Sequence, residues 1–568
     1  MRRHAGHEGA VASKVVPVYH SSVSDKSGWQ TRAGVIALGI FLTIVMTYPT
    51  VTALMTAGRL GTSDGRYSIW NVGWVAHALT TNPLGLFDAN IFYPASGTLA
   101  YSEPNVIGGA LGVPTYLATG SPIAALNGAI ALGTLLSFFF MWALVRRLTG
   151  SSVAGVLAAV TFTFSPFVSA RTAHIQLYLV FVFPMVVHAF VRMVDGPSVL
   201  RGAWLGVTMA IAALTCGYYG LLLIALMGLL AAWWATWDLA YWRSLAVGAV
   251  VTAALVLPVV VPYMAIRAEA GAGGRGGVES RTYAASWRDY LTSGTDAHAV
   301  FSRRVAAGRP ADRSVEVLFP GVVVLVVGVA GFVAAVRRGG RQRRWALSTA
   351  AVAGLGLWAS FGPDAGLYTL IAQLPGMELL RAPARFGILV PFGLSIAGGY
   401  AVAQWTRHRT WVGVALVLLA AAELKSTWPL DQMPPLPAAY RLLAQLPPGP
   451  VIEYPFPYRR TDFHNHTKAM LHSAYHWRPI VNGYSDFTPD GFEEMAGPVN
   501  AFPDPSSFQL LRSLGVRYVV WRASEYNGEA RAILEARFAP YGEHLRPLTR
   551  DGDVWLYEIV SWPEGAQP

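Results

Sequence analysis

Charged residues are scarce in this sequence. They make up only 13% of its 568 residues, whereas a soluble domain usually has about 25%. The shortage is concentrated between residues 33 and 411, where uncharged stretches close to the roughly 20 residues needed to span a bilayer recur. From residue 431 onward the sequence has an ordinary mixed polar composition. A chain that is soluble throughout is therefore excluded, and a membrane region followed by a soluble region is predicted.

Cysteine is nearly absent, since Cys216 is the only one. A disulfide within the chain and a cysteine metal cluster are both excluded. The net charge of +11 raises the question of nucleic acid. Most lysines and arginines, however, lie in short loops between apolar stretches, which is the pattern that orients a membrane protein. No nucleic-acid partner is expected.

The apolar stretches predict the fold class: a mainly α, polytopic helical membrane protein of about ten to twelve transmembrane helices, followed by a small α/β domain. The expected spans are 33–56, 122–145, 152–170, 175–191, 202–216, 219–235, 244–266, 317–336, 345–361, 386–406 and 411–426. Strands are expected at 450–454, 516–521 and 553–559, with helices at 506–514 and 528–536. Residues 105–121 would be re-entrant or lie on the membrane surface, and the last span is weak because it contains Glu423 and Lys425.

Alternate loops contain the basic residues, and placing these loops inside satisfies the positive-inside rule. The expected domains are a cytoplasmic tail (1–32), a transmembrane domain (33–428) and an extracytoplasmic domain (429–568). Three long outer loops then share the side of the C-terminal domain: 57–121, 267–316 and 362–385. Because irregular sequence gathers on that side, the protein is expected to act there.

The first outer loop places an acidic residue at the edge of the membrane. Asp64 directly follows the first span, and residues 67–79 have helical spacing with Trp70 and Trp74 on one side. This predicts an amphipathic helix at the interface with its tryptophans at headgroup depth. A carboxylate there is suited to act as a general base toward an attacking hydroxyl, and partial burial is expected to raise its pKa toward the working range. The alternative interpretation is that Asp64 is a helix N-cap.

This arrangement resembles the GT-C membrane glycosyltransferases. The shared features are an aspartate just past the first span, an interfacial helix, many spans and an outer C-terminal domain. The local stretches FYP (92–94), GTL (97–99) and RAPARF (381–386) are similar to bacterial membrane proteins grouped with that superfamily. The resemblance implies that Asp64 activates the acceptor and that the donor is a polyprenyl-phosphate-linked sugar in the bacterial inner membrane. No Asp-Asp, Asp-Glu or Asp-x-Asp motif follows, so no cofactor is assigned and a divalent metal (Mg²⁺ or Mn²⁺) stays open.

Arginines on the outer side are candidates to bind the donor phosphate, because a guanidinium matches phosphate oxygens. Arg381 and Arg385 flank a proline at the outer start of a span. Arg171 lies at another outer edge together with His174, and Arg281 is one of several arginines in the loop 267–316, whose glycine-rich part (271–277) is suited to be a lid. The alternative is that each arginine only anchors the protein at the interface or pairs with nearby acids, and does not bind the donor phosphate.

Other polar residues are candidate contacts for the acceptor or the sugar. They are Asp88, Tyr101, Glu103 and His174, although acids in such loops are more often turn or cap residues. In the C-terminal domain, four histidines between 464 and 476 suggest a zinc site. No acidic motif accompanies them, so no metal ligand is assigned.

The sequence thus predicts an inverting glycosyltransferase that moves a hexose or pentose from a polyprenyl-phosphate carrier to a glycan, lipid or protein acceptor at the outer face. The rival interpretations are a lipid or polysaccharide transporter or flippase, and a non-catalytic assembly subunit. Transporters usually show internal repeats and ionisable groups in mid-span. Neither is evident in this sequence, which favours the enzyme.

Overall fold

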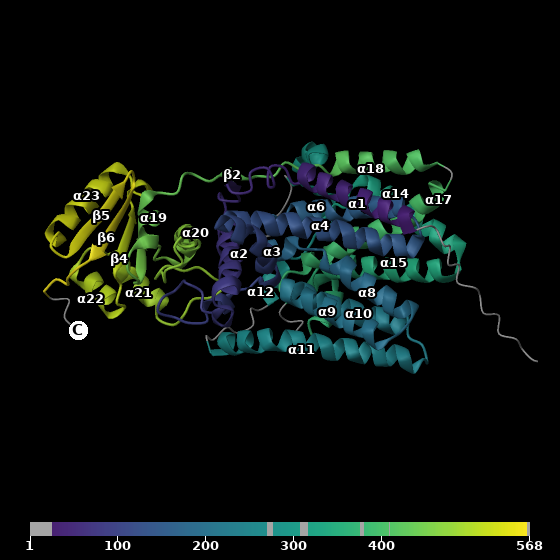
Figure 1. Ribbon diagram of the computed structural model, residues 1–568, viewed down its shortest axis with the longest axis horizontal. Coiled ribbons are helices and arrows are strands. Elements are labelled where there is room, and N and C mark those ends of the chain that lie inside the picture. The colour runs from purple at the N-terminus through teal and green to yellow at the C-terminus, as the bar shows by residue number, and fades with distance from the viewer. Residues whose placement is uncertain (1–24, 270–276, 307–315, 375–379, 408, 565–568) are drawn as a thin grey trace, which may run out of the picture.

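The computed structural model describes residues 25–269, 277–306, 316–374, 380–407 and 409–564. Figure 1 shows an elongated bundle of roughly aligned helices with the C-terminal region at one end. That end is called the domain end here, and the other end is called the far end. The bundle consists of α1 (Asp25–Met46), α4 (Pro122–Thr149), α5 (Ser152–Thr163), α8 (Val182–Asp195), α9 (Val199–Thr215), α10 (Gly217–Trp233), α11 (Leu239–Glu269), α14 (Val322–Arg338), α15 (Gly340–Ser360), α17 (Leu389–Trp405) and α18 (Thr410–Leu424).

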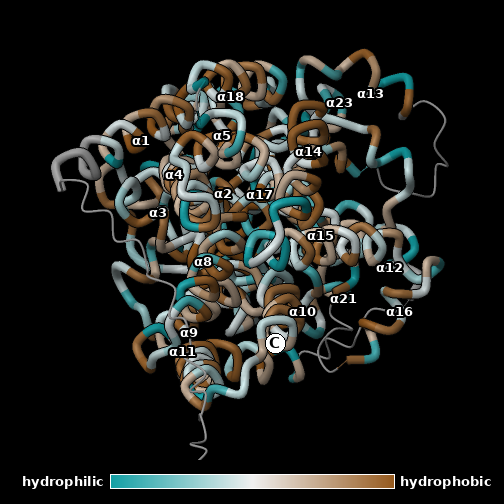
Figure 2. The backbone as a smooth tube through the Cα atoms, turned by 90° about the vertical axis from the view of Figure 1, so that its right-hand side faces the viewer, coloured by the Kyte–Doolittle hydropathy of each residue, from teal (hydrophilic) through white to brown (hydrophobic). Residues whose placement is uncertain are grey.

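The apolar helices confirm a membrane protein. Four described helices are long and apolar enough to cross a bilayer: Pro122–Thr149, Ser152–Ser169, Leu239–Glu269 and Pro383–Trp405. Five shorter apolar helices accompany them, and Figure 2 shows hydrophobic residues along most of the bundle. The first expected span (33–56) is shorter than predicted, because α1 ends at Met46 and turns follow. The weak last helix, α18, reaches the domain end, where the Glu423 carboxylate accepts a 2.9 Å hydrogen bond from the Val323 backbone N–H at the start of α14.

Two helices lie across the domain end of the bundle. α2 (Ser63–Thr81) runs roughly perpendicular to the bundle helices in Figure 1. α3 (Val106–Thr119) packs antiparallel along it, with Gly109 beside Val75 and Gly112 beside Val72. A Cβ added at Gly109 would come within 2.2 Å of Val75, so the close approach of these helices requires glycine. Most of the segment 105–121 therefore forms a helix across the bundle end, and its re-entrant or surface-lying place in the membrane stays a prediction.

The C-terminal region contains a four-stranded sheet in the order β3-β4-β6-β5. Its strands are β3 (Val451–Tyr454), β4 (Tyr518–Arg522), β5 (Leu545–Asp551) and β6 (Val554–Ile559). β3 and β4 are parallel, and the other two pairs are antiparallel. The three strands expected from the sequence are confirmed, and β5 was missed. The helices are α19 (Ala438–Gln445), α20 (Thr467–Ser473), α21 (Phe492–Asn500), α22 (Pro505–Ser513) and α23 (Gly528–Phe538).

The connections between these parts are short elements that surround the domain end. β1 (Ala57–Gly58) pairs antiparallel with β2 (Asp431–Gln432), which joins the loop after α1 to the start of the C-terminal region. The remaining short helices are α6 (Pro166–Ser169), α7 (Ile175–Tyr178), α12 (Gly277–Thr282), α13 (Ala299–Ala306) and α16 (Leu367–Ile371), with 3-10 turns η7 (Pro383–Ile388) and η8 (Arg460–His466) among others.

The C-terminal region covers one face of α2, and this corrects the expectation that its tryptophans lie at headgroup depth. Trp70 is fully buried and Trp74 is 9% exposed. The indole N–H of Trp70 donates to Asn90 Oδ1 at 3.0 Å, and that of Trp74 donates to the Leu86 carbonyl at 2.9 Å. Both side chains belong to the hydrophobic core of the C-terminal region. A buried indole needs a partner for its N–H, and the folded loop supplies it.

Candidate functional site

Asp64 lies in the first turn of α2, but it is not the N-cap. The cap is Thr62, whose backbone is extended (φ −118°) and whose hydroxyl accepts from the Gly65 backbone N–H at 3.2 Å. The interpretation of Asp64 as a cap is therefore wrong. Because threonine already satisfies an unpaired donor of the first turn, the Asp64 carboxylate is free to point elsewhere.

The Asp64 carboxylate meets His174. Oδ2 of Asp64 lies 3.3 Å from Nε2 of His174, and both side chains are about half exposed (50% and 40%). The hydrogen bond from His174 is the largest cause that lowers the pKa of Asp64, and burial partly opposes it. Asp64 is therefore a carboxylate at neutral pH, half open to solvent, with one oxygen held by an imidazole. The expectation that burial raises its pKa is therefore wrong, because the hydrogen bond from His174 outweighs burial. The ionised carboxylate can accept a proton, although the lowered pKa makes it a weaker base than a free aspartate.

A polar face of α2 leads away from Asp64. Tyr67, Ser68 and Asn71 follow at helical spacing and lie on the same side of the helix. The hydroxyl of Ser68 donates to the Ala173 carbonyl at 2.7 Å, and the amide of Asn71 donates to the Glu103 carbonyl at 3.4 Å. Asp64 and Asn71 are roughly 10 Å apart along the helix axis, at 1.5 Å per residue. This face therefore joins the candidate base to the loop that contains Glu103.

Glu103 is held at the start of α10. Its Oε1 accepts a 2.5 Å hydrogen bond from the Gly217 backbone N–H, the first residue of that helix. Burial raises the pKa of Glu103, while the nearby Arg385 opposes this increase. The guanidinium carbon of Arg385 in turn lies 4.9 Å from the centroid of the Tyr218 ring. Glu103 and Arg385, which are far apart in the sequence, are thus neighbours.

Arg381 lies beside this pair and has two carboxylates around it. Its guanidinium is 3.5 Å from Asp486 and 3.9 Å from Glu279. Arg381 and Arg385 flank Pro383 at η7, as the sequence predicted, and both are at the domain end. Asp486 also accepts from the Ser102 hydroxyl at 3.3 Å. Two arginines, two glutamates and an aspartate from the C-terminal region therefore surround one polar site beside α2.

Two other candidate arginines have structural partners. Arg171 pairs with Glu316 at 2.5 Å, and both side chains are nearly buried (12% and 11% exposed). The carbonyl of Arg171 accepts from the His174 N–H at 2.9 Å, so this residue supports the loop that presents His174. Arg281 lies 3.4 Å from Asp364 and is 69% exposed. The structure thus does not place Arg281 beside Arg385, because its short helix α12 directs it toward solvent.

Two further predicted contacts are part of the loop architecture. Asp88 Oδ1 accepts from the Gly97 backbone N–H at 2.9 Å, and Gly97 adopts a positive φ of 67°, which closes the turn. Tyr101 is only 6% exposed, and its ring centroid is 4.6 Å from that of Phe487. Both residues shape the loop 57–121, where Tyr101 is buried and the Asp88 side chain is exposed to solvent.

Sequence reasoning missed the contribution of the C-terminal region. Besides Asp486, it supplies Thr467, whose hydroxyl accepts from Arg66 Nε at 3.0 Å, and His464, which is close enough to lower the pKa of Asp64 slightly. No local signal in the sequence points to these residues. By contrast, the spacing of Tyr67, Ser68 and Asn71 relative to Asp64 was a usable signal for the polar face.

The residues present do not complete a metal site. Within the described ranges no group of three or more His, Cys, Asp or Glu side chains is arranged to hold a metal ion. Two of the four histidines between residues 464 and 476 have separate partners: His466 Nε2 bonds the Pro457 carbonyl, and His476 Nδ1 accepts from Arg478 N–H.

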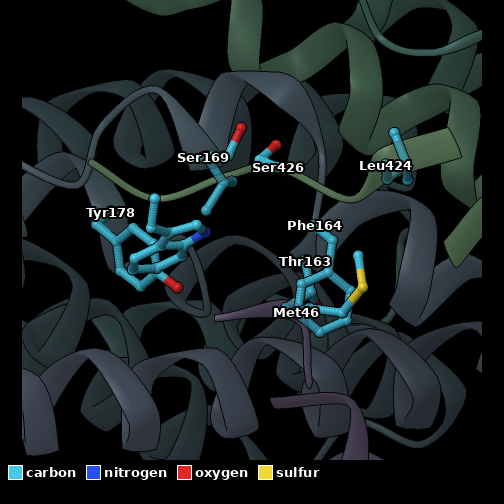
Figure 3. Close-up of a pocket in the computed structure, with 9 residues that line it drawn as sticks. Met46, Thr163, Phe164, Ser169, Tyr178, Leu424 and Ser426 are labelled. Carbon is cyan, nitrogen blue, oxygen red and sulfur yellow. The ribbon is translucent and has the colours of Figure 1, made fainter. Parts of the chain in front are cut away.

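A small pocket near this end is too small to hold a substrate. It has a volume of about 10 Å³ and lies among Met46, Thr163, Tyr178, Ser426 and other residues (Figure 3). Such a volume accommodates roughly one water molecule. The hydroxyls of Thr163 and Ser426 have no protein partner, so a water there would satisfy them.

Comparisons with known proteins rest on structure. No family model matches the sequence, and no curated protein matches it. Among solved structures, arabinofuranosyltransferase AftD from Mycobacteria has a TM-score of 0.58 at 15% identity, with 96% of this chain and 40% of that chain covered. This chain therefore spans about two fifths of the length of AftD.

Two more solved structures match most of this chain. The oligosaccharyltransferase AglB from Archaeoglobus fulgidus, in complex with an inhibitory peptide and a dolichol-phosphate, has a TM-score of 0.50 at 12% identity, with 92% of this chain and 73% of that chain covered. ArnT from Cupriavidus metallidurans bound to undecaprenyl phosphate covers 96% of this chain and 100% of its own at 15% identity, but its TM-score of 0.37 supports no argument. At such identities the likeness shows the fold.

Proposed function

We propose that this chain, whose fold is that of the GT-C membrane glycosyltransferases, transfers a sugar from a polyprenyl-phosphate carrier to an acceptor hydroxyl. The observation that supports this most is the polar face of α2, which begins at the Asp64–His174 pair and reaches the loop of Glu103 beside Arg385. It brings a carboxylate base and a pair of guanidiniums to the same end of a membrane bundle.

The proposed reaction is a single displacement with inversion. Asp64 takes the proton of the acceptor hydroxyl while the hydroxyl oxygen attacks the anomeric carbon of the sugar. The bond between that carbon and the phosphate oxygen breaks, and its electrons stay on the phosphate. A base lies about 3 Å from the hydroxyl it activates, and reacting atoms approach to roughly 3–3.5 Å. The reaction therefore requires the base and the phosphate clamp to lie within on the order of 10 Å of each other when the substrates are bound.

Arg381 and Arg385 would stabilise the departing phosphate. The phosphate gains a negative charge as the sugar leaves, and fixed guanidiniums favour that charged state over the starting one. His174 would orient the Asp64 carboxylate and keep it ionised.

The proposed location follows from the distribution of charge. Arginines gather at the far end, including Arg147, Arg337, Arg338 and Arg344, and this end would be cytoplasmic. The domain end and the C-terminal region would then face the outside of a bacterial inner membrane. The acceptor would be a glycan, a lipid or a protein reached from that side.

The test is transfer of radiolabelled sugar from a polyprenyl-phosphate donor by the purified chain in proteoliposomes. A glycosyltransferase produces labelled acceptor and free polyprenyl phosphate. A flippase moves the lipid across the bilayer without cleaving it, and an assembly subunit does neither. Either of the last two outcomes would refute the proposal.

Replacing His174 with alanine is expected to shift the acid limb of the pH profile upward. The hydrogen bond from His174 lowers the pKa of Asp64, and burial raises it. Without the imidazole the pKa rises, so Asp64 becomes protonated, and inactive as a base, at a higher pH than in the parent protein. The pH dependence of kcat/KM measures this, because it reports groups of the free enzyme. His464→Ala is the control, because His464 has the smallest of the effects on the pKa of Asp64. If His174→Ala leaves the acid limb where it is in the parent protein, His174 does not have this role.

Asp486→Asn is expected to strengthen donor binding modestly. The Asp486 carboxylate lies 3.5 Å from Arg381, where a phosphate oxygen of the donor would compete for the same guanidinium. The pair is about one third exposed, so its contribution is small, and we expect the KM for the lipid donor to fall by up to about fivefold. Asp490→Asn, in the same loop, is the matched control. A rise in KM would mean that Asp486 positions Arg381 instead of competing for it.

A further inference from the structure

A cleft at the far end of the bundle lies away from the site of Asp64. It has a volume of about 770 Å³ and lies between the last turns of α14 and α17. The two helices run parallel and touch closely in their middle: a Cβ added at Gly331 would come within 1.9 Å of the Ala397 carbonyl. At their ends the side chains become large, and Arg337, Arg338, Trp405 and Arg407 line the space. The volume is in the range of small-molecule and lipid sites.

The charge of this cleft favours an anion. Three arginines line it, and its lining contains no carboxylate. The C-terminal ends of α14 and α17 each add about half a negative charge from the helix dipole, so the net charge at the cleft is about +2. The nearby acid Asp195 is already engaged by Arg147 and Arg341. Among the described residues the three arginines form no ion pair, so they are available to an external anion.

The wall of the cleft is apolar below its charged rim. Ala330, Val333 and Ala334 line it one to two turns deeper along α14 than Arg337. Trp405 is 41% exposed at the rim, where the indole of a membrane protein commonly meets lipid headgroups. A free phosphate has no apolar part that could be buried against this wall. A molecule with an anionic head and an acyl chain matches both parts.

We propose that this cleft binds one anionic phospholipid, with its headgroup phosphate on Arg337, Arg338 and Arg407 and an acyl chain along Val333. Basic pockets between transmembrane helices are suited to such headgroups. The proposal does not depend on the proposed transferase function, because none of these residues belongs to the site of Asp64.

Native mass spectrometry of the full chain after detergent extraction tests this proposal. Phosphatidylglycerol and phosphatidylcholine with identical acyl chains are added in turn. We expect one phosphatidylglycerol to stay bound and phosphatidylcholine to dissociate. The triple variant Arg337→Gln, Arg338→Gln, Arg407→Gln should weaken the binding by about a hundredfold, at roughly fivefold for each arginine. Inorganic phosphate alone should not displace the lipid.

A second triple variant supplies the matched control. Arg32→Gln, Arg192→Gln and Arg243→Gln remove the same charge from exposed arginines that do not line the cleft, and should leave binding within about threefold. Gln404→Glu, a single exposed change in the lining, should weaken binding even if the triple variant folds poorly. Equal losses in the two triple variants, equal retention of phosphatidylcholine, or displacement by inorganic phosphate would each overturn the proposal.

Discussion

Asp64→Asn is expected to lower sugar transfer by about a hundredfold to ten-thousandfold, which is the usual contribution of a general base. Asparagine has the same shape as aspartate and keeps an oxygen toward His174, but it cannot take the proton of the acceptor. The fold should be unchanged, because Thr62 and not Asp64 caps α2. Transfer from a radiolabelled polyprenyl-phosphate donor in proteoliposomes, with thermal unfolding as the check on folding, measures the effect.

The control for this variant is Asp88→Asn in the same loop. Asp88 uses its carboxylate only to accept the Gly97 N–H, and an asparagine oxygen can accept the same bond. Its activity should stay within about threefold of the parent protein, a change of less than 1 kcal/mol. If Asp64→Asn also stays near parent activity, another residue is the base, and Glu103 would be the next to examine because burial raises its pKa.

Arg385→Gln is expected to cost about a hundredfold to a thousandfold in kcat, as the loss of one fixed donor to a developing negative charge typically does. Arg385 lies beside Glu103 and over the Tyr218 ring, so its guanidinium is held in place before the donor binds. Lysine at this position should restore only part of the activity, because it keeps the charge but lacks the planar fork. Single-turnover measurements at saturating donor separate this effect from weaker binding.

Arg281→Gln is the matched control for Arg385. It removes the same charge from a residue that is 69% exposed and pairs with Asp364. Exposed pairs contribute little, so activity and stability should change by less than about 1 kcal/mol. Equal losses in the two variants would indicate that the arginines act only through the overall charge of this surface.

Local properties of the sequence were sufficient to predict much of this protein. Apolar stretches marked the bundle helices, since the length of an apolar segment alone decides whether it can span a bilayer. The alternation of residues predicted β3, β4 and β6. The position of Asp64 at the end of the first apolar stretch, and of Arg381 and Arg385 around Pro383, placed all three at the same end.

Only the tertiary structure decided which residues meet. His174 reaches Asp64 because the turn between α6 and α7 lies against the first turns of α2, and Asp486 reaches Ser102 across 384 positions of sequence. Arg171 pairs with Glu316, which is 145 residues away in the sequence, and this pair supports the fold. The tryptophans of α2 are buried because another part of the chain covers them. Hydropathy and helical spacing describe neighbours along the chain, whereas a site depends on which helix ends and loops the packing of the whole bundle brings together.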